Sequence, residues 1–551
     1  MPDAVPEAGW GLPTVLVIVI VASVYLGTLA QRAMAKSGFL KGFFLGNRGL
    51  GVWAMALTAT VQSGGTFMGV PSYIYTYGWI VALWIGSYML VPLTGFGILG
   101  KRIAQLSRRT GAVTVPELFR RRFDSPALGI VASTFILIFL SFLFIAQFKA
   151  GAIVMKIAIP NSGALALAEE LPAASDVALL SLWDSLDKKY LFGLVIFACT
   201  VVGYTLIGGF LASVWTDLFQ SVLMWFGVLI LLGLTLYHVG GLENATRTAI
   251  ENTGPGYAYG PGYGAVNPET GQAREFLPVS LAVSMFVIWI FGGVATPAGL
   301  VRLMASKDTA TLRRSVLVLS LYNCCIYIPL IVICIAARGI MPDLDKSDEV
   351  IPRMALMMTQ DFAGGSLVAG LILAAPFGAI MATVSTFLIV ISSGIVHDIY
   401  QQVFHPHADE KHLKRLTRIV MIVVGMIAVL ANIKPIDYLQ ALIVFCTSGA
   451  AATFLAPALL AAYWRRANAA GAIAAMVTGA SVVLVLFLVG QFTPDPNFGP
   501  TSMRPYYLFG LDPVVWGIPG SLLAGVAVSL FTPPPSPELV ARMFDRLPAT
   551  K

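Results

Sequence analysis

The sequence predicts an all-α polytopic membrane protein with about 13 transmembrane helices, most of them arranged as two halves of opposite topology. Three observations support this fold class. Hydrophobic residues make up 57% of the chain and charged residues only 11%, which is far from the composition of a soluble protein. Apolar runs long enough to cross a bilayer recur from end to end. Two of these runs are interrupted in their middle, and the interruptions lie five spans apart.

The first apolar run, at 11–33, follows a segment that contains Asp3 and Glu7 and no basic residue. Because a secretory signal begins with basic residues, we expect this run to remain as a span. The other runs lie at about 50–74, 77–99, 126–155, 190–208, 211–238, 276–298, 312–337, 364–395, 416–431, 438–463, 469–490 and 511–531.

These runs predict one integral membrane domain over residues 1–551, without a separate soluble domain. The run at 11–33 is an extra first helix. Residues 50–238 form the first repeat and residues 276–463 form the inverted second repeat, because a repeat of five spans reverses the direction of its second copy. Two C-terminal helices follow at 469–531.

Two spans contain residues that interrupt a helix in mid-membrane. The second span holds Gln62–Thr66, which reads QSGGT, and the seventh holds Gly292–Gly293 and then Thr296–Pro297. A broken helix exposes backbone N–H and carbonyl groups that a ligand can use. We therefore expect a binding site between the two breaks, near the middle of the membrane.

The loop charges set the orientation. Basic residues dominate 101–124, and Arg302, Lys307 and Arg313 are assigned with them to the inside, whereas the loops at 156–189 and 338–362 hold more acidic than basic residues. Basic loops face the cytoplasm. The chain is thus expected in the plasma (cell inner) membrane as a multi-pass protein, with the N-terminus outside and the C-terminus inside.

The stretch from Gly378 to Tyr400 is apolar but rich in small and hydroxyl residues. Ala379, Ala382, Thr383 and Thr386 fall on one helical face. Such a face either lets another helix pack closely or gathers carbonyl and hydroxyl oxygens around a hard cation. The stretch alone leaves both interpretations open.

Five segments carry a family resemblance: LGNRGLGVWAMALTATVQSGGTFMG from Leu45, GILGKRIAQLSRR from Gly97, GYTLIGGFLASVWTDLFQ from Gly203, GAIMATVSTFLIVISSGIVHDIY from Gly378, and YWRRANAAGA from Tyr463. With these segments the chain resembles the sodium:solute symporter family, and within it most of all the pantothenate permease group. The resemblance implies a leucine-transporter-type 5+5 inverted-repeat fold and Na+-driven alternating access.

The resemblance also implies a main Na+ site. It falls on the carbonyls of Ala59 and Gln62 in the second span and on Ala379, Ala382 and Thr383 in the ninth. Many members have a hydroxyl residue where this chain has Ala382, which leaves Thr383 as the one side-chain oxygen of the set. Hard cations accept neutral oxygens, so the site stays chemically sound.

In some relatives a second Na+ lies nearby on an aspartate and two hydroxyls, which match Asp217, Ser385 and Thr386 here. The alternative for Asp217 is structural, since a carboxylate near the inner end of a span also caps a helix or pairs locally.

The resemblance and the repeat argument together predict solute ligands between the two breaks. Where the pantothenate permeases have Pro-His after the second break, this chain has Pro297-Ala298. Aromatic residues in spans are often packing or interface anchors, and that alternative stays open for three of the candidates. The candidates are Ser63, Thr66, Tyr73, Tyr77, Gln147, Trp289 and Thr296.

Lys149 adds a cation inside an otherwise apolar span. An intramembrane charge normally has a partner or a wet cavity. One interpretation is a counter-ion for a carboxylate solute. The other is snorkelling toward the outer headgroups, because Lys149 lies about 10 Å along the helix from Lys156.

Together these observations predict Na+-coupled uptake of a small organic solute, such as a carboxylate or vitamin-like anion of the pantothenate kind. The alternatives are a Na+ symporter for a neutral sugar, polyol or amino acid, and a transporter-fold sensor without turnover. No nucleophile with its base is recognisable, so we do not expect an enzyme. The expected partners are the solute, Na+ and membrane lipids, with no nucleic acid and no obligate protein partner.

Overall fold

The computed structural model describes residues 8–34, 50–58, 63–160, 187–260, 264–266, 273–275, 278–434, 439–493 and 505–545. The first half of the chain contains α1 (Gly11–Met34), α3 (Val52–Thr58), η2 (Gly65–Gly69), α4 (Val70–Tyr77), η3 (Gly78–Val81), α5 (Ala82–Pro92), η4 (Leu93–Gly100), α6 (Lys101–Thr110), α7 (Val115–Phe123), α8 (Pro126–Ala158), α11 (Lys188–Val239), α12 (Leu242–Thr253), η5 (Pro255–Ala258) and the strands β1 (Gly264–Val266) and β2 (Ala273–Glu275). The second half contains α13 (Val279–Ala295), α14 (Pro297–Met304), α15 (Thr309–Ile340), η6 (Ser347–Glu349), α16 (Val350–Thr359), α17 (Gly365–Ser393), η7 (Gly394–Phe404), α18 (Glu410–Ala431), α19 (Leu439–Tyr463), α20 (Ala469–Phe492), η8 (Leu508–Gly510), α21 (Pro513–Phe531) and α22 (Pro537–Phe544).

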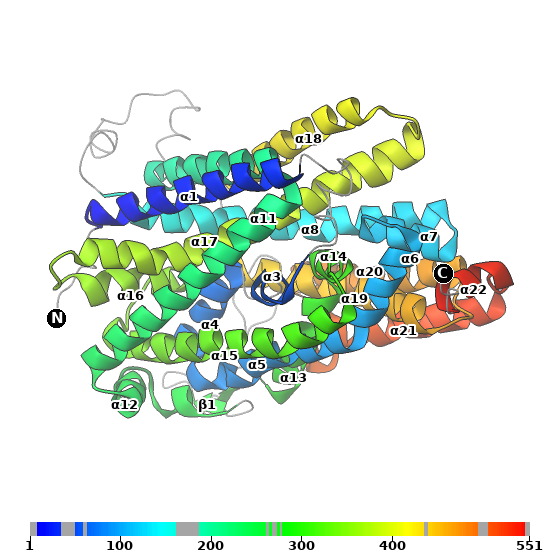
Figure 1. The fold of residues 1–551 in the computed structure, drawn as a ribbon. Coiled ribbons are helices and arrows are strands. Elements are labelled where there is room, and N and C mark those ends of the chain that lie inside the picture. The colour runs from blue at the N-terminus through cyan, green and yellow to red at the C-terminus, as the bar shows by residue number, and fades with distance from the viewer. Residues whose placement is uncertain are drawn as a thin grey trace, which may run out of the picture.

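The long helices run roughly side by side, from the end of the molecule where α1 begins to the end where α22 lies (Figure 1). Two of them form the centre. In the most apolar stretch of the span that contains α17, 83% of the residues are buried, and in that of α19 94% are buried, compared with 28% for α1. A helix that is apolar all round and buried belongs to the core of a bundle. The helix with the predicted Na+ residues is thus a central one, and it packs against α1, α8 and α11.

The fold class predicted from the sequence is confirmed. Among the described residues, ten helices are long and apolar enough to cross a membrane, or eleven if the bent pair Gly65–Val81 and Ile85–Thr110 counts as one span. The predicted span at 50–74 is described as α3 up to Thr58 and again from Ser63 onward, and residues 59–62 lie outside the described residues. The predicted span at 416–431 corresponds to α18, whose first half carries several Lys and Arg residues. The antiparallel pair β1 and β2 is a small exception to the all-helical character of the described chain.

The fifth and sixth predicted spans form one element, α11, with a kink at Gly209. This residue has φ 58° and ψ −152°, a backbone conformation that is essentially restricted to glycine. It separates the spans Lys188–Ile207 and Ala212–Val239. The kink at this residue therefore lies between two spans that the sequence predicts as separate helices.

The break in the seventh span lies at Thr296. Helix α13 ends at Ala295 and α14 begins at Pro297, and Thr296 between them is extended, with φ −61° and ψ 142°. Its side chain caps α14 by accepting a hydrogen bond from the Gly299 N–H at 3.2 Å. The predicted interruption at Gly292–Gly293 is wrong, because both residues are helical. A Cβ on Gly292 would lie 2.4 Å from Thr447 Cγ2, so close packing accounts for this glycine.

The last described helix, α22, docks on the end of the bundle where α6 and α7 lie (Figure 1). Arg109 donates a hydrogen bond to the Met543 carbonyl at 2.5 Å. The guanidinium of Arg122 is buried, lies 4.9 Å from the centre of the Phe544 ring, and donates to the Ala461 carbonyl at the end of α19 at 3.0 Å. Helix α22 thus packs on α6 and α7, and Arg122 of α7 connects this end of the bundle to the end of α19.

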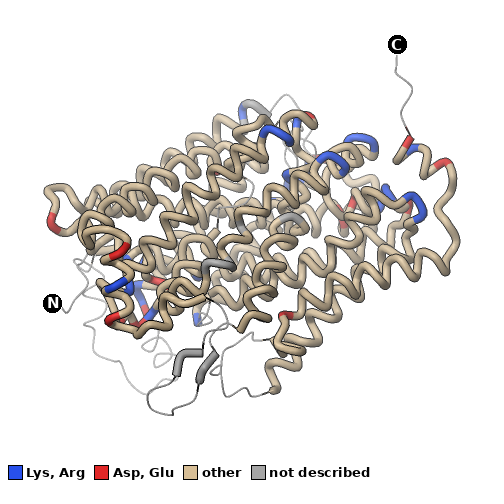
Figure 2. Tube along the Cα trace, turned by 90° about the horizontal axis from the view of Figure 1, so that it is seen from below, with Lys and Arg blue, Asp and Glu red and all other residues tan. Residues whose placement is uncertain are grey.

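Along the chain trace, most of the positions coloured for Lys and Arg lie toward the end of the molecule that holds the C-terminus (Figure 2). Arg302 is an exception to the loop assignment made from the sequence. It lies within α14, and only 9% of it is exposed. The expectation that Arg302 belongs to an inside loop is therefore wrong, and this residue is considered with the binding site.

Candidate ion and solute site

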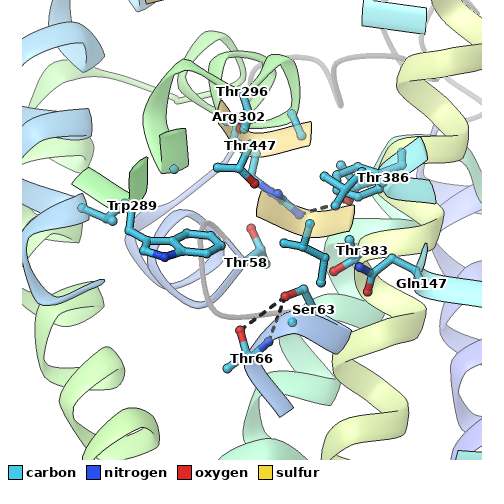
Figure 3. Close-up of a pocket in the computed structure, with 18 residues that line it drawn as sticks. Thr58, Ser63, Thr66, Gln147, Trp289, Thr296, Arg302, Thr383, Thr386 and Thr447 are labelled. Carbon is cyan, nitrogen blue, oxygen red and sulfur yellow. Dashed lines mark hydrogen bonds between the residues drawn. The ribbon is translucent and has the colours of Figure 1, made fainter. Parts of the chain in front are cut away.

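A cavity of about 120 Å³ lies between the two helix breaks. Ser63, Gly65 and Thr66 line it from the first break, and Thr296 and Gly299 line it from the second. Side chains of α8, α17 and α19 complete the wall (Figure 3). The cavity thus lies where the positions of the breaks predict a binding site.

Five of the predicted solute ligands line this cavity. They come from four separated segments: the start of η2, the middle of α8, the end of α13 and the break before α14. Figure 3 shows Trp289 across the cavity from Gln147. The five residues are Ser63, Thr66, Gln147, Trp289 and Thr296.

The hydroxyls at the first break form a chain. The Thr66 N–H donates to Ser63 Oγ at 3.2 Å, and the two hydroxyl oxygens lie 3.3 Å apart. Thr66 Oγ1 also lies 3.2 Å from the hydroxyl of Tyr327 on α15. These bonds satisfy part of the backbone that the break exposes.

Gln147 closes the same break from α8. Its Oε1 accepts a hydrogen bond from the Gly64 N–H at 2.7 Å. A Cβ on Gly64 would lie 2.6 Å from Ala150 Cβ, so glycine permits this approach. Gln147 is fully buried, and its Nε2 has no hydrogen-bond acceptor in the described part of the chain. Since a buried donor normally has a partner, this amide is suited to a solute oxygen.

Tyr73 and Tyr77 do not line the cavity. Their rings stack on α4 with centroids 5.9 Å apart, and both are packed against the hydrophobic core. The packing alternative considered for these aromatic residues accounts for their position.

The main Na+ site can be followed only on α17. Thr383 lines the cavity, and its Oγ1 donates to the Ala379 carbonyl at 3.1 Å. Ala382 is fully buried, and its carbonyl accepts from Ser385 Oγ at 3.0 Å. Ala59 and Gln62 lie outside the described residues. The oxygens of Ala379 and Thr383 are thus adjacent, as a shared ion would require.

The candidate second-site residues form a hydroxyl cluster between α11 and α17. Ser213 Oγ lies 2.8 Å from Ser385 Oγ and 3.4 Å from Thr386 Oγ1. Asp217 lies one helical turn after Ser213 on α11. Both Asp217 and Ser385 are fully buried, whereas Thr386 also lines the cavity.

Asp217 is paired with a cation from another helix. Its Oδ2 accepts a hydrogen bond from Arg302 Nη2 at 3.2 Å. The same nitrogen donates to Thr386 Oγ1 at 3.0 Å (Figure 3). Asp217 is therefore not a local helix cap. Arg302 follows the break-forming Pro297 by five residues on α14 and lines the cavity. The short distance in sequence from Arg302 to the break could have indicated that it lies near the binding site, but the assignment of basic residues to loops did not take the break into account.

Lys149 pairs with the segment η6 and not with the cavity. Its Nζ lies 3.0 Å from Asp348 Oδ2, and the two side chains are 10% and 12% exposed. The ammonium group thus has a carboxylate partner within the described chain. Lys149 is absent from the cavity lining, so its assignment as a solute ligand is not supported by the geometry.

The sodium:solute symporter family model matches residues 43–169 and 178–479. The chain belongs to the sodium:solute symporter family. It is 32% identical over 476 residues to the sodium/pantothenate symporter of Escherichia coli strain K12, covering 86% of this chain and 88% of that protein. It is 30% identical over 503 residues to the sodium/pantothenate symporter of Haemophilus influenzae, covering 89% of this chain and 94% of that protein. The osmoregulated proline transporter OpuE of Bacillus subtilis is 27% identical, covering 92% of each chain.

A solved structure of a Na+-coupled sialic acid symporter, in a substrate-bound outward-open state, superposes with a TM-score of 0.69 at 19% identity, covering 96% of this chain and 99% of that one. This likeness confirms the inverted-repeat fold of the symporter. Na+ is the coupling ion of the family, and its curated relatives are transporters.

Several lining residues of the symporter were not predicted. Thr58, at the end of α3, donates its hydroxyl to the Ala54 carbonyl at 2.6 Å, and Thr447 and Phe387 line the cavity from α19 and α17. A threonine that bonds its own helix has no signature in one sequence. Only the packing of the helices identifies these positions.

Proposed function

We propose that this symporter imports a small organic carboxylate, driven by the inward Na+ gradient, across the inner membrane with its N-terminus outside and its C-terminus inside. One observation carries the proposal. Arg302 is the one charged side chain among the described residues that line the cavity. A guanidinium matches the geometry of a carboxylate better than any other side chain does.

The chemistry of the relatives supports the same class of solute. The matching proteins are named for pantothenate and for proline, and the solved structure for sialic acid. All three solutes carry a carboxylate. Pantothenate is our first candidate, because the two pantothenate symporters are 30% and 32% identical to this chain.

We propose that the main Na+ is held by the carbonyls of Ala59, Gln62, Ala379 and Ala382 together with Thr383. The adjacent Ala379 carbonyl and Thr383 hydroxyl, 3.1 Å apart, support this assignment. Neutral oxygens suit a monovalent hard cation. A proton relay would need titratable groups, and this set of ligands contains none. Ser63, Thr66, Gln147, Trp289 and Thr296 are the proposed solute contacts beside Arg302.

The test is uptake into proteoliposomes with an inward Na+ gradient, compared with K+ and choline gradients. Labelled pantothenate, proline and sialic acid are offered in parallel with glucose and inositol. We expect Na+-dependent accumulation of pantothenate or sialic acid, which carry a net negative charge, and of neither glucose nor inositol. Accumulation of proline alone, which has no net charge, would favour the neutral amino-acid alternative. Accumulation of glucose or inositol would contradict the carboxylate assignment, and Na+-dependent binding without any accumulation would favour a sensor.

A further inference from the structure

Asp217 needs a cation in every state in which it is ionised. It is fully buried between α11 and α17, where an unpaired carboxylate would be strongly destabilising. In this structure the cation is Arg302, and its side chain is only 10% exposed. The pair is neutral, and it forms part of the wall between the hydroxyl cluster and the cavity.

The oxygens around this pair are also suited to a metal cation. Thr386 Oγ1 lies 3.0 Å from the Arg302 nitrogen and 3.4 Å from Ser213 Oγ, which is 2.8 Å from Ser385 Oγ. One carboxylate and three hydroxyls form a hard-oxygen set of the kind that binds Na+. The guanidinium group therefore occupies a position that a small cation could also take.

The contact made by the guanidinium is incomplete. A single nitrogen of Arg302 serves both Asp217, at 3.2 Å, and Thr386, whereas a strong Arg–carboxylate pair uses two parallel hydrogen bonds. Within the described residues, Arg302 Nε is buried and has no acceptor. The nearby cavity holds a second buried donor of the same kind, Gln147 Nε2. Within the described residues, the lining thus provides donors for an anion and contains no carboxylate of its own, and Asp217 behind the wall is the group that competes for Arg302.

We propose that Arg302 exchanges with Na+ at Asp217: the guanidinium neutralises Asp217 while the second Na+ site is vacant, and the arrival of Na+ turns it into the cavity, where it binds the carboxylate of the solute. The proposal rests on the proposed function and deepens it. Charge balance supplies the coupling. Asp217 with Arg302 is neutral, the added Na+ leaves one excess positive charge in a buried site, and a solute carboxylate removes that excess. Na+ and anion therefore favour each other's binding, as linkage requires.

The exchange predicts that one variant binds Na+ more tightly and the solute anion more weakly. In Arg302→Met, Asp217 loses its resident cation, so we expect the apparent Na+ affinity to rise by about tenfold, which corresponds to roughly 1.4 kcal/mol. The same variant should bind pantothenate at least about tenfold more weakly, because the charge partner is gone. A residue with only a structural role would weaken both ligands or neither.

The first arm uses Na+ alone. Thermal unfolding of the purified full chain is measured over a NaCl series at ionic strength held constant with choline chloride. The wild type is compared with Arg302→Met, Arg302→Lys and Lys149→Met. Lys149→Met is the matched control, because it removes an intramembrane cation that does not line the cavity. It should leave the Na+ midpoint unchanged, and Arg302→Lys should stay closer to the wild type than Arg302→Met.

The second arm uses pantothenate and its uncharged alcohol analogue panthenol as competing probes in the presence of saturating Na+. Arg302→Met should lose the preference for pantothenate over panthenol. If Arg302→Met does not fold, the double variant Asp217→Asn/Arg302→Met removes both charges. It should retain one Na+ midpoint without the gain in affinity, and show the same loss of anion preference.

An unchanged or weakened Na+ affinity in Arg302→Met overturns the exchange. So does an intact preference for pantothenate over panthenol in that variant. If the wild type binds neither probe, the pantothenate assignment fails, and the Na+ arm still decides the exchange because it uses no solute.

Discussion

Two ion pairs in the described part of the symporter join segments that are far apart in the chain, and they differ in what surrounds them. Lys149 and Asp348 have 10% and 12% of their side chains exposed, and neither lines the cavity. Arg302 and Asp217 lie beside hydroxyl groups on the cavity wall, and Asp217 is fully buried. The pair Lys149–Asp348 holds α8 to η6. In the pair Arg302–Asp217, a competing cation or anion could also replace one of the two partners.

The difference shows that the role of an intramembrane charge depends on the groups that surround it and not on its depth in the membrane. Both cations sit in apolar helices, and the sequence makes Lys149 the more conspicuous one. The oxygens of Ser213, Ser385 and Thr386 give the Arg302 pair its second possible occupant. Variants of the two pairs should therefore differ in both the size and the kind of their effects.

The largest effect is expected from Asp217→Asn. It leaves the Arg302 guanidinium buried without a counter-charge, which costs roughly 3–5 kcal/mol of stability. If Asp217 carries the second Na+, the Hill coefficient for Na+ in uptake should also fall from about two to about one. Thermal unfolding and initial uptake rates measure the two effects. A wild-type Hill coefficient of one, with equal flux of solute and charge, would exclude the second site.

The next largest effect is expected from Thr383→Val, which removes the one side-chain oxygen proposed at the main Na+ site while keeping the shape of the side chain. We expect the Na+ concentration for half-maximal uptake to rise by about tenfold, or roughly 1.4 kcal/mol. Ala382→Ser is the matched control, because it adds the hydroxyl that many relatives have and should leave Na+ affinity equal or improved. Unchanged Na+ dependence in Thr383→Val would remove this residue from the site.

A smaller effect is expected from Lys149→Met. The variant keeps the length and apolar contacts of the side chain and breaks the pair with Asp348 at 3.0 Å. We expect a loss of about 1 kcal/mol in stability, because Asp348 keeps 12% of its side chain exposed and water can hydrate it in the variant. The apparent affinity for the solute should be unchanged. Asp348→Asn should have the same consequence. A marked loss of pantothenate affinity in Lys149→Met alone would restore Lys149 as the solute's charge partner.

The smallest expected effect is a difference between the two ion pairs in how their contribution to stability depends on salt concentration. Choline chloride raises ionic strength without supplying Na+, and at physiological ionic strength charges are screened over about 8 Å. The stability difference between the wild type and Lys149→Met should shrink as choline chloride increases. The difference between the wild type and Asp217→Asn should not, because that pair is buried. Equal salt sensitivity of the two differences would contradict this distinction.

Much of the fold could be predicted because the bilayer imposes its constraints residue by residue. Apolar runs and Gly or Pro interruptions are visible in one sequence, and the break at Thr296–Pro297 is confirmed. The interruption at Gly292–Gly293 was wrong because glycine has the same appearance whether it breaks a helix or admits a neighbour. Only the nearness of Thr447 distinguishes the two cases.

The site was less predictable because its charges are matched across helices far apart in the chain. Positions 217 and 302 are on α11 and α14, and no local pattern links them. Loop assignment depends on distance from a span, so a cation just after a broken helix is counted as cytoplasmic. The hydroxyls of Thr383 and Thr386 were found because they recur at helical spacing, whereas Thr58 and Thr447 have no such periodicity.

Helix α22 has a practical consequence for anyone who produces this protein. Phe544 covers the buried Arg122, and the Met543 carbonyl accepts a hydrogen bond from Arg109, so α22 covers one side of α6 and α7. Deleting the chain from Ser536 onward would uncover a guanidinium and the apolar surface under Leu539 and Met543. Expression vectors should therefore place purification handles beyond residue 545 with a flexible spacer, and a shortened chain designed for crystallisation should keep this helix.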